Sequence, residues 1–198
     1  MKKIFAALVV FCLIATEKTN AQLQRGNVLV GGDVANFDIG LRKNAGFDVA
    51  INPKAAWFIN NNIAVGPYID FEIRKENKAS ATTTDYGVGA LARYYLGVSQ
   101  VNTESVLRHT RAFFEGNVGI AGENKSKGGG STNGLGLGIG PGIAYFITPN
   151  VGLETILKYN GLLGFGDATT QSDLNLSVGF QIYLPGKATR NKVMNDVK

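Results

Sequence analysis

The sequence is poor in residues that could hold a metal ion or a disulfide. Its 198 residues include one cysteine, Cys12, and one histidine, His109. Cys12 lies in an N-terminal apolar run that we expect to be removed, which would leave the mature chain without a thiol. No group of histidines and carboxylates shows metal-ligand spacing. We therefore expect no metal, no disulfide framework and no other cofactor.

Signatures of enzymes and of nucleic-acid-binding proteins are also missing. His109 falls in a long predicted periplasmic turn, residues 97–110, on the wrong side for a hydrolase of the outer leaflet. Residues Gly87 to Ala92 formally fit a dinucleotide fingerprint, but the apolar alternation continues through Tyr94, so no helix begins at the glycines. No basic block is interleaved with aromatic residues. We predict neither an enzyme nor a partner of nucleic acids.

The one long apolar run lies at the N-terminus. Two lysines precede twelve apolar residues, 4–15, and a small residue, Ala21, precedes Gln22. Twelve helical residues reach about 18 Å, which is short of the ~30 Å hydrocarbon core. A basic start, a short apolar run and a small residue are typical of a secretory signal peptide. We predict that residues 1–21 are a cleaved signal; a buried N-terminal helix is the alternative.

The net charge is mild and partly terminal. The formal charge is +5, and the predicted signal contributes two of these charges. Residues 185–198 hold four basic side chains against one acidic side chain, Asp196. We predict that this segment is a disordered, basic periplasmic tail.

Apolar residues after Ala21 alternate with polar or small ones instead of forming membrane-length runs. The alternation is strict over 173–184, where Leu176, Val178 and Phe180 share one face. Twenty-six glycines disfavour helices. The same period of two predicts eight strands, at 27 onward, 47–59, 63–74, 84–96, 112–122, 134–145, 151–160 and 173–184.

Eight strands of about ten residues suit tilted crossings of a bilayer better than a soluble sheet. The sequence therefore predicts an all-β, eight-stranded, antiparallel up-and-down transmembrane β-barrel over residues 22–184. Proline removes a ladder hydrogen bond, so we expect bulges or early strand ends at Pro53, Pro67 and Pro141. The extracellular loops are predicted at 36–46, 76–83, 123–132 and 161–172.

An internal repeat supports this strand arrangement. Residues Ala56 to Val65 parallel Ala144 to Leu153, and each segment is interpreted as a strand, a tight polar turn and a second strand. Pro53 and Pro141 share the same offset. Trp57 and Tyr145, next to the turns, are typical of an aromatic girdle at the membrane surface.

Alternation does not say which face meets lipid, and a lipocalin-like soluble barrel would enclose its apolar face. The apolar faces of the last seven strands carry no charge, which favours lipid outside. The opposite face carries charges of both signs, including Asp48 and Lys54. We predict that this face lines the lumen with a salt-bridged polar network of Asp70, Glu72, Arg74, Arg93, Glu115, Glu154 and Lys158.

Three segments resemble a known family: Arg93 to Leu96, Phe113 to Gly119, and Tyr145 to Leu153. They are similar to the small outer-membrane β-barrel domain of Bacteroidetes, related in style to OmpX, OmpA and OmpW barrels. The resemblance implies the cell outer membrane as location, its lipid as surroundings, and the barrel-assembly and periplasmic chaperone machinery as partners during biogenesis. The long turn 97–110 and the residues after the last strand depart from the pattern.

Two classes of function remain open. The first is a structural or surface-interaction barrel whose lumen is a closed, salt-bridged plug, because eight strands enclose little more than side chains. The alternative is a narrow channel or an uptake barrel for a small apolar or ionic solute. No extracellular ligand is indicated by the sequence.

Overall fold

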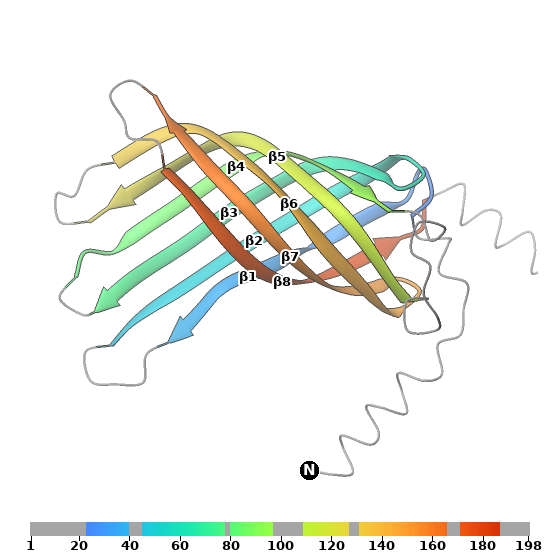
Figure 1. Cartoon of the computed structure of the whole chain (residues 1–198), viewed down its shortest axis with the longest axis horizontal. Coiled ribbons are helices and arrows are strands. Elements are labelled where there is room, and N and C mark those ends of the chain that lie inside the picture. The colour runs from blue at the N-terminus through green and yellow to red at the C-terminus, as the bar shows by residue number, and fades with distance from the viewer. Residues whose placement is uncertain are drawn as a thin grey trace, which may run out of the picture.

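The computed structural model describes residues 23–39, 45–77, 80–96, 109–126, 131–165 and 171–186. The predicted signal peptide, nearly all of the predicted tail and most of the turn 97–110 lie outside these residues. Eight antiparallel strands pair in chain order, and β1 pairs with β8 to close the barrel (Figure 1). The strands are β1 (Val28–Ile39), β2 (Ala45–Asn60), β3 (Ile63–Asn77), β4 (Thr83–Tyr95), β5 (Thr110–Lys125), β6 (Ser131–Thr148), β7 (Val151–Gly164) and β8 (Gln171–Leu184).

The predicted fold class is confirmed, but the strands are longer than predicted at one end. About half of the residues in the predicted extracellular loops belong to strands; Lys125, for example, still pairs with Thr83. The alternation of apolar and polar residues does not predict these parts of the strands, because both faces of a strand meet water once it leaves the bilayer. No helix long and apolar enough to cross a membrane occurs among the described residues.

The expectation of bulges or strand ends at the prolines is wrong. Pro53, Pro67 and Pro141 lie inside β2, β3 and β6, and each points outward. The register of β2 on β3 is unchanged across Pro53, from Ile51↔Phe71 to Lys54↔Tyr68. A proline on the lipid face thus removes a ladder donor without displacing the strand.

Two register shifts lie instead beside the short turns and follow the internal repeat, whereas a third lies between Ala35 and Asp38 towards the other end of β1. One falls between Phe58 and Asn60, before the turn that joins β2 to β3. Another falls between Phe146 and Thr148, before the turn that joins β6 to β7. The two hairpins therefore share their bulge position as well as their sequence pattern. Because periplasmic turns of such barrels are short, these hairpins mark the periplasmic end.

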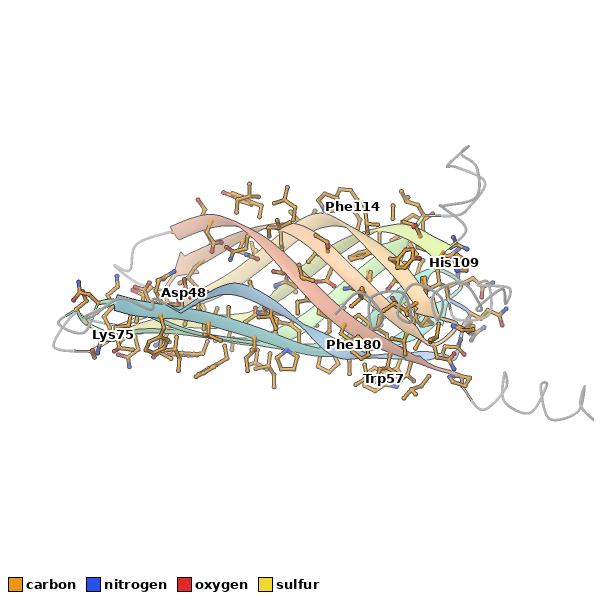
Figure 2. The ribbon with its side chains drawn as sticks, turned by 90° about the horizontal axis from the view of Figure 1, so that it is seen from below. Asp48, Trp57, Lys75, His109, Phe114 and Phe180 are labelled. Atoms are coloured by element: carbon orange, nitrogen blue, oxygen red, sulfur yellow. The ribbon has the colours of Figure 1, made fainter. Side chains whose placement is uncertain are left out.

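The apolar side chains of the strands face outward. Leu176, Val178 and Phe180 are 61%, 57% and 47% exposed, whereas Gln181 is fully buried. Figure 2 shows Trp57, Phe114 and Phe180 projecting from the outside of the wall. This arrangement is the inverse of a lipocalin-like barrel and agrees with the predicted lipid-facing surface.

Aromatic side chains form two outward-facing groups near the strand ends. The periplasmic group includes Trp57, Tyr94, Phe114 and Tyr145, all exposed. The group towards the other end consists of Phe47, Phe71, Tyr86 and Tyr159, also exposed. Aromatic rings at two levels are typical of the two interfaces of a membrane.

The residues before β1 lie at the periplasmic end of the barrel, where they are hydrogen-bonded to the β2–β3 hairpin. The Gly26 amide donates to the Phe58 carbonyl at 2.8 Å, and the Asn62 amide donates to the Leu23 carbonyl at 2.9 Å. The Leu23 side chain is 5% exposed and belongs to the buried core of the barrel. Residues 23–27, called the N-terminal strap below, are therefore part of the folded barrel.

Candidate functional site

The periplasmic half of the lumen is filled with aromatic rings. Phe58, Tyr95, Phe113, Phe146 and Tyr183 are each at most 2% exposed, and they come from five different strands. Their ring centroids lie 4.9 to 6.4 Å apart in a connected set. These five residues, called the aromatic floor below, are buried together with the aliphatic side chains of Leu29, Leu91 and Ile156.

Directly above the aromatic floor, Arg93 occupies the centre of a buried charge cluster. Its Nε and Nη2 donate to Glu115 Oε2 at 2.9 and 2.6 Å, and its Nη1 donates to Glu154 Oε2 at 2.6 Å. The guanidinium carbon also lies 4.0 Å from the centre of the Phe113 ring. The cation is thus held by two carboxylates and rests on the aromatic floor.

Two lysines complete the cluster. Lys54 Nζ lies 2.5 Å from Asp33 Oδ2 and 3.3 Å from Glu115 Oε2. Lys158 Nζ donates to Glu115 Oε1 at 2.5 Å. We call these six residues the charge layer: Asp33, Glu115 and Glu154 against Lys54, Arg93 and Lys158. Its formal charges are equal in number, so the layer is neutral as a whole.

Hydroxyl and amide groups donate further hydrogen bonds to the carboxylates of the charge layer. The Tyr183 hydroxyl donates to Glu154 Oε1 at 2.6 Å and lies 2.8 Å from the Tyr95 hydroxyl oxygen. Gln181 Nε2 donates to Asp33 Oδ1 at 3.0 Å. Charges buried in this way are stable only when paired and hydrogen-bonded. The charge layer and the aromatic floor together fill the periplasmic half of the lumen, called the inner half below.

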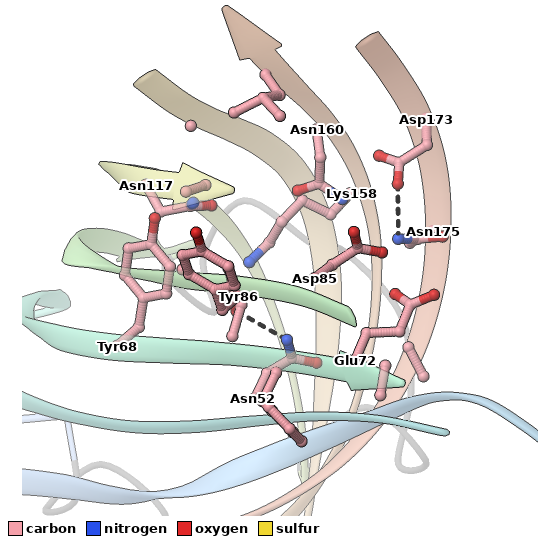
Figure 3. A pocket seen from close by; sticks show the side chains of 18 of the residues that line it. Asn52, Tyr68, Glu72, Asp85, Tyr86, Asn117, Lys158, Asn160, Asp173 and Asn175 are labelled. Atoms are coloured by element: carbon pink, nitrogen blue, oxygen red, sulfur yellow. Dashed lines mark hydrogen bonds between the residues drawn. The ribbon is translucent and has the colours of Figure 1, made fainter. Parts of the chain in front are cut away.

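Above the charge layer the lumen widens into a cavity of about 290 Å³, called the vestibule below. Its lower boundary includes Asp33, Tyr68 and Lys158, and its lining extends to Glu123 and Ser172 near the outer strand ends. Side chains from several strands surround this space, as Figure 3 shows for the labelled amides and carboxylates. The vestibule therefore lies at the end opposite the short turns.

Comparisons with known proteins agree with this geometry. A family model described as Opacity family porin protein matches residues 15–184. The chain belongs to the Opacity family of porins. No curated protein sequence matches it. Its family and fold make it an outer-membrane β-barrel.

Two solved structures support the Opacity-family fold. Neisserial surface protein A is 24% identical with a TM-score of 0.52, and the match covers 79% of this chain and 95% of that one. The N-terminal β-barrel domain of Pseudomonas aeruginosa OprF is 13% identical with a TM-score of 0.50, covering 81% and 98%. At these identities the likeness concerns the barrel fold alone.

The structure distributes the seven residues of the predicted network over three places in this Opacity-family barrel. Arg93, Glu115, Glu154 and Lys158 meet in the charge layer. Glu72 and Arg74 lie nearer the outer end, where Arg74 contacts Glu72 at 3.0 Å and Asp85 at 3.2 Å. Asp70 accepts a hydrogen bond from Asn52 at 2.7 Å. The predicted set is therefore two separate ionic clusters and one carboxylate between them.

One member of the charge layer, Asp33, has no assigned face in the sequence analysis, because the first strand is less regular and Gly31 and Gly32 interrupt its alternation. Tyr183 shares the polar face of the alternation over 173–184, which places it inside the lumen, and Tyr95 has the same parity as Arg93. Their hydrogen bonds to Glu154 and to each other leave no signal in the sequence.

Proposed function

We propose that this protein is a closed surface-interaction barrel that passes no solute and catalyses no reaction. Its work would be done by the outer strand ends and the loops that join them, while the filled inner half keeps the membrane sealed. The observation that carries this proposal is the stacking of the neutral charge layer on the aromatic floor.

The energetics of the charge layer support a permanently closed state. A solute or ion crossing the barrel would have to displace Arg93 from Glu115 and Glu154. Separating one partner from a buried ion pair typically costs about 3–5 kcal/mol. The aromatic floor would also have to move, and it belongs to the same buried cluster as the strap residue Leu23. Both obstacles lie in series along the only path through an eight-stranded barrel.

Export and assembly are part of the proposal. Residues 1–21 would be removed during secretion, and the barrel would be inserted by the barrel-assembly machinery after passage with periplasmic chaperones. Sequencing of the mature protein should begin at or near Gln22, and recovery of membrane-embedded protein starting at Met1 would contradict this step. Membership in the Bacteroidetes form of the domain remains a prediction.

Planar-bilayer recordings test the closed state. The purified full chain should insert without steady conductance. Steady conductance that changes when Arg93 or Glu115 is neutralised would overturn the proposal in favour of a narrow channel, the runner-up function.

The surface role is tested on intact cells. An epitope inserted between Phe165 and Gln171, which join β7 to β8 at the outer end, should bind antibody without permeabilisation. An epitope that is reached only after permeabilisation would reverse the orientation and overturn the surface-interaction role. Insertion at Asn61, in the β2–β3 turn, is the matched control and should give the opposite accessibility.

A further inference from the structure

We propose that the vestibule is a binding site for a small organic polycation, of the size and chemistry of a polyamine. The inference rests on the closed inner half proposed above, because an open lumen would make this cavity a passage. It goes further by assigning a ligand class to the space above the charge layer.

The size and lining of the vestibule argue for a hydrophilic ligand. Most small-molecule pockets are largely apolar and measure roughly 300–1,000 Å³. The vestibule, at about 290 Å³, is at the small end of that range. Four side-chain amides from four different strands line it, and each amide can both donate and accept. They are Asn52, Asn117, Asn160 and Asn175.

The charges of the lining argue for a cation. Six carboxylates line the vestibule against two cationic residues, Arg74 and Lys158. Lys158 is already paired with Glu115 in the charge layer, and Arg74 is shared by Glu72 and Asp85. Asp33 is paired with Lys54, and Glu123 is paired with Lys125. The negative charge that remains uncompensated in the lining lies on Asp70, on Asp173 and on the two carboxylates that share Arg74.

Two carboxylates of the lining, Asp70 and Asp173, have a negative charge that no cationic side chain neutralises directly. Asp70 and Asp173 make no ion pair with any described residue, and each accepts a hydrogen bond only from an amide, Asn52 or Asn175. Figure 3 shows both hydrogen bonds as dashed lines and Asp173 facing the same space as Glu72 and Asp85. An independent observation is the Asn117 amide oxygen, which is buried in the lining without a hydrogen-bond partner. These groups can accept hydrogen bonds from the ammonium groups of a flexible polyamine.

A chain of several ammonium groups suits this arrangement better than a single metal ion. The acidic side chains are spread over the wall, and no group of three or more metal-ligating side chains is close enough for a metal among the described residues. Several spaced acceptors match several spaced donors, and neutralisation of each carboxylate adds to the affinity. The floor of the site, formed by the neutral charge layer, would stop the ligand from passing through.

Calorimetric titration of spermidine into the full chain, reconstituted in phosphatidylcholine vesicles, tests the inference. The wild type should bind, and binding should weaken as salt is added. The double substitution Asp70→Asn and Asp173→Asn preserves shape and removes two charges. Affinity should fall by up to about thirtyfold, which is about 2 kcal/mol for the loss of two partly exposed ion pairs.

Controls separate the site from general attraction. Asp196→Asn removes the same kind of charge from the C-terminal tail and should leave affinity unchanged. A neutral polyol of similar size should not bind the wild type. Equal spermidine affinity for the wild type and the double variant, or no binding at all, would overturn the inference. Conductance measured on the same samples tests the closed barrel separately. Failure of the closed-barrel proposal can therefore be distinguished from failure of the polycation-binding proposal.

Discussion

Arg93 and Glu154 meet across the lumen, 2.6 Å apart, although their strands β4 and β7 are not neighbours in the barrel. Glu115, on the strand next to β4, binds the other side of the same guanidinium. Arg93 therefore connects opposite walls, and it does so where the lumen is filled. Loss of this one side chain would leave two carboxylates buried without their shared partner.

The first prediction concerns that connection. Arg93→Ala should lower the free energy of unfolding by about 3–5 kcal/mol, the usual effect of breaking a buried ion pair. Arg93→Lys should have an intermediate effect, because an ammonium cannot bind two carboxylates with the guanidinium geometry. Urea unfolding of the barrel in lipid vesicles measures both changes.

Lys125→Ala is the matched control for Arg93. Lys125 ends β5 and pairs with Glu123 at 2.7 Å, but its side chain is 43% exposed. Exposed pairs contribute about 0–1 kcal/mol, so this variant should unfold almost like the wild type. Equal, small effects of the two substitutions would mean that the lumen is solvated and that the charge layer does not seal it.

The second prediction concerns close contact between two strands. Gly89 on β4 is in register with Gly119 on β5, and a Cβ on Gly89 would collide with the Val118 backbone carbonyl. Backbone cannot rotate away like a side chain, so Gly89→Ala should destabilise the barrel by about 1–3 kcal/mol. Gly116→Ala is the control, because the nearest atom to its Cβ would be 3.8 Å away. Thermal unfolding monitored by circular dichroism should separate the two variants.

Period two sufficed to predict the strands and their faces because each residue's parity reports its side of the wall. Gly89 lies in a continuing strand, as the alternation through Tyr94 indicated, and its glycine is explained by the approach of β5. The partners of Arg93 could not be predicted in this way. They depend on the register of four strands and on the curvature of the closed barrel, and neither leaves a signal in local sequence.

The ends of the strands could not be predicted for a different reason. Thr83 and Lys125 lie in β4 and β5 beyond the apolar band, where polar residues are acceptable on either face. The sequence pattern therefore ends before the hydrogen-bonded ladder does, and the ladder pairs Thr83 with Lys125 directly. Interpreting this loss of alternation as loop residues made the predicted extracellular loops too long.

The third prediction concerns facing in the membrane. Single cysteines at Val178 and Leu176 should react with a lipid-phase label, because both positions are exposed on the outside of β8. A cysteine at Ser177 should not react, because its side chain is buried towards the lumen. The native Cys12 is replaced or removed with the signal in all samples. Reactivity at Ser177 with protection of its two neighbours would require the lipid face to be on the other side of the sheet.

The fourth prediction concerns the N-terminal strap. Leu23 is buried in the core of the barrel and its carbonyl accepts the Asn62 amide, so the strap closes the lumen beneath the aromatic floor. Leu23→Asp would bury a carboxylate among aromatic rings without a partner, which should cost about 2 kcal/mol or more. Gln24→Asp adds the same charge at the adjacent exposed position and should be nearly neutral. Urea midpoints in vesicles compare the stabilities, and swelling of liposomes in small sugars tests whether detaching the strap loosens the seal. If the two variants unfold alike, the strap does not contribute to the fold, and residues 23–27 do not help to close the barrel.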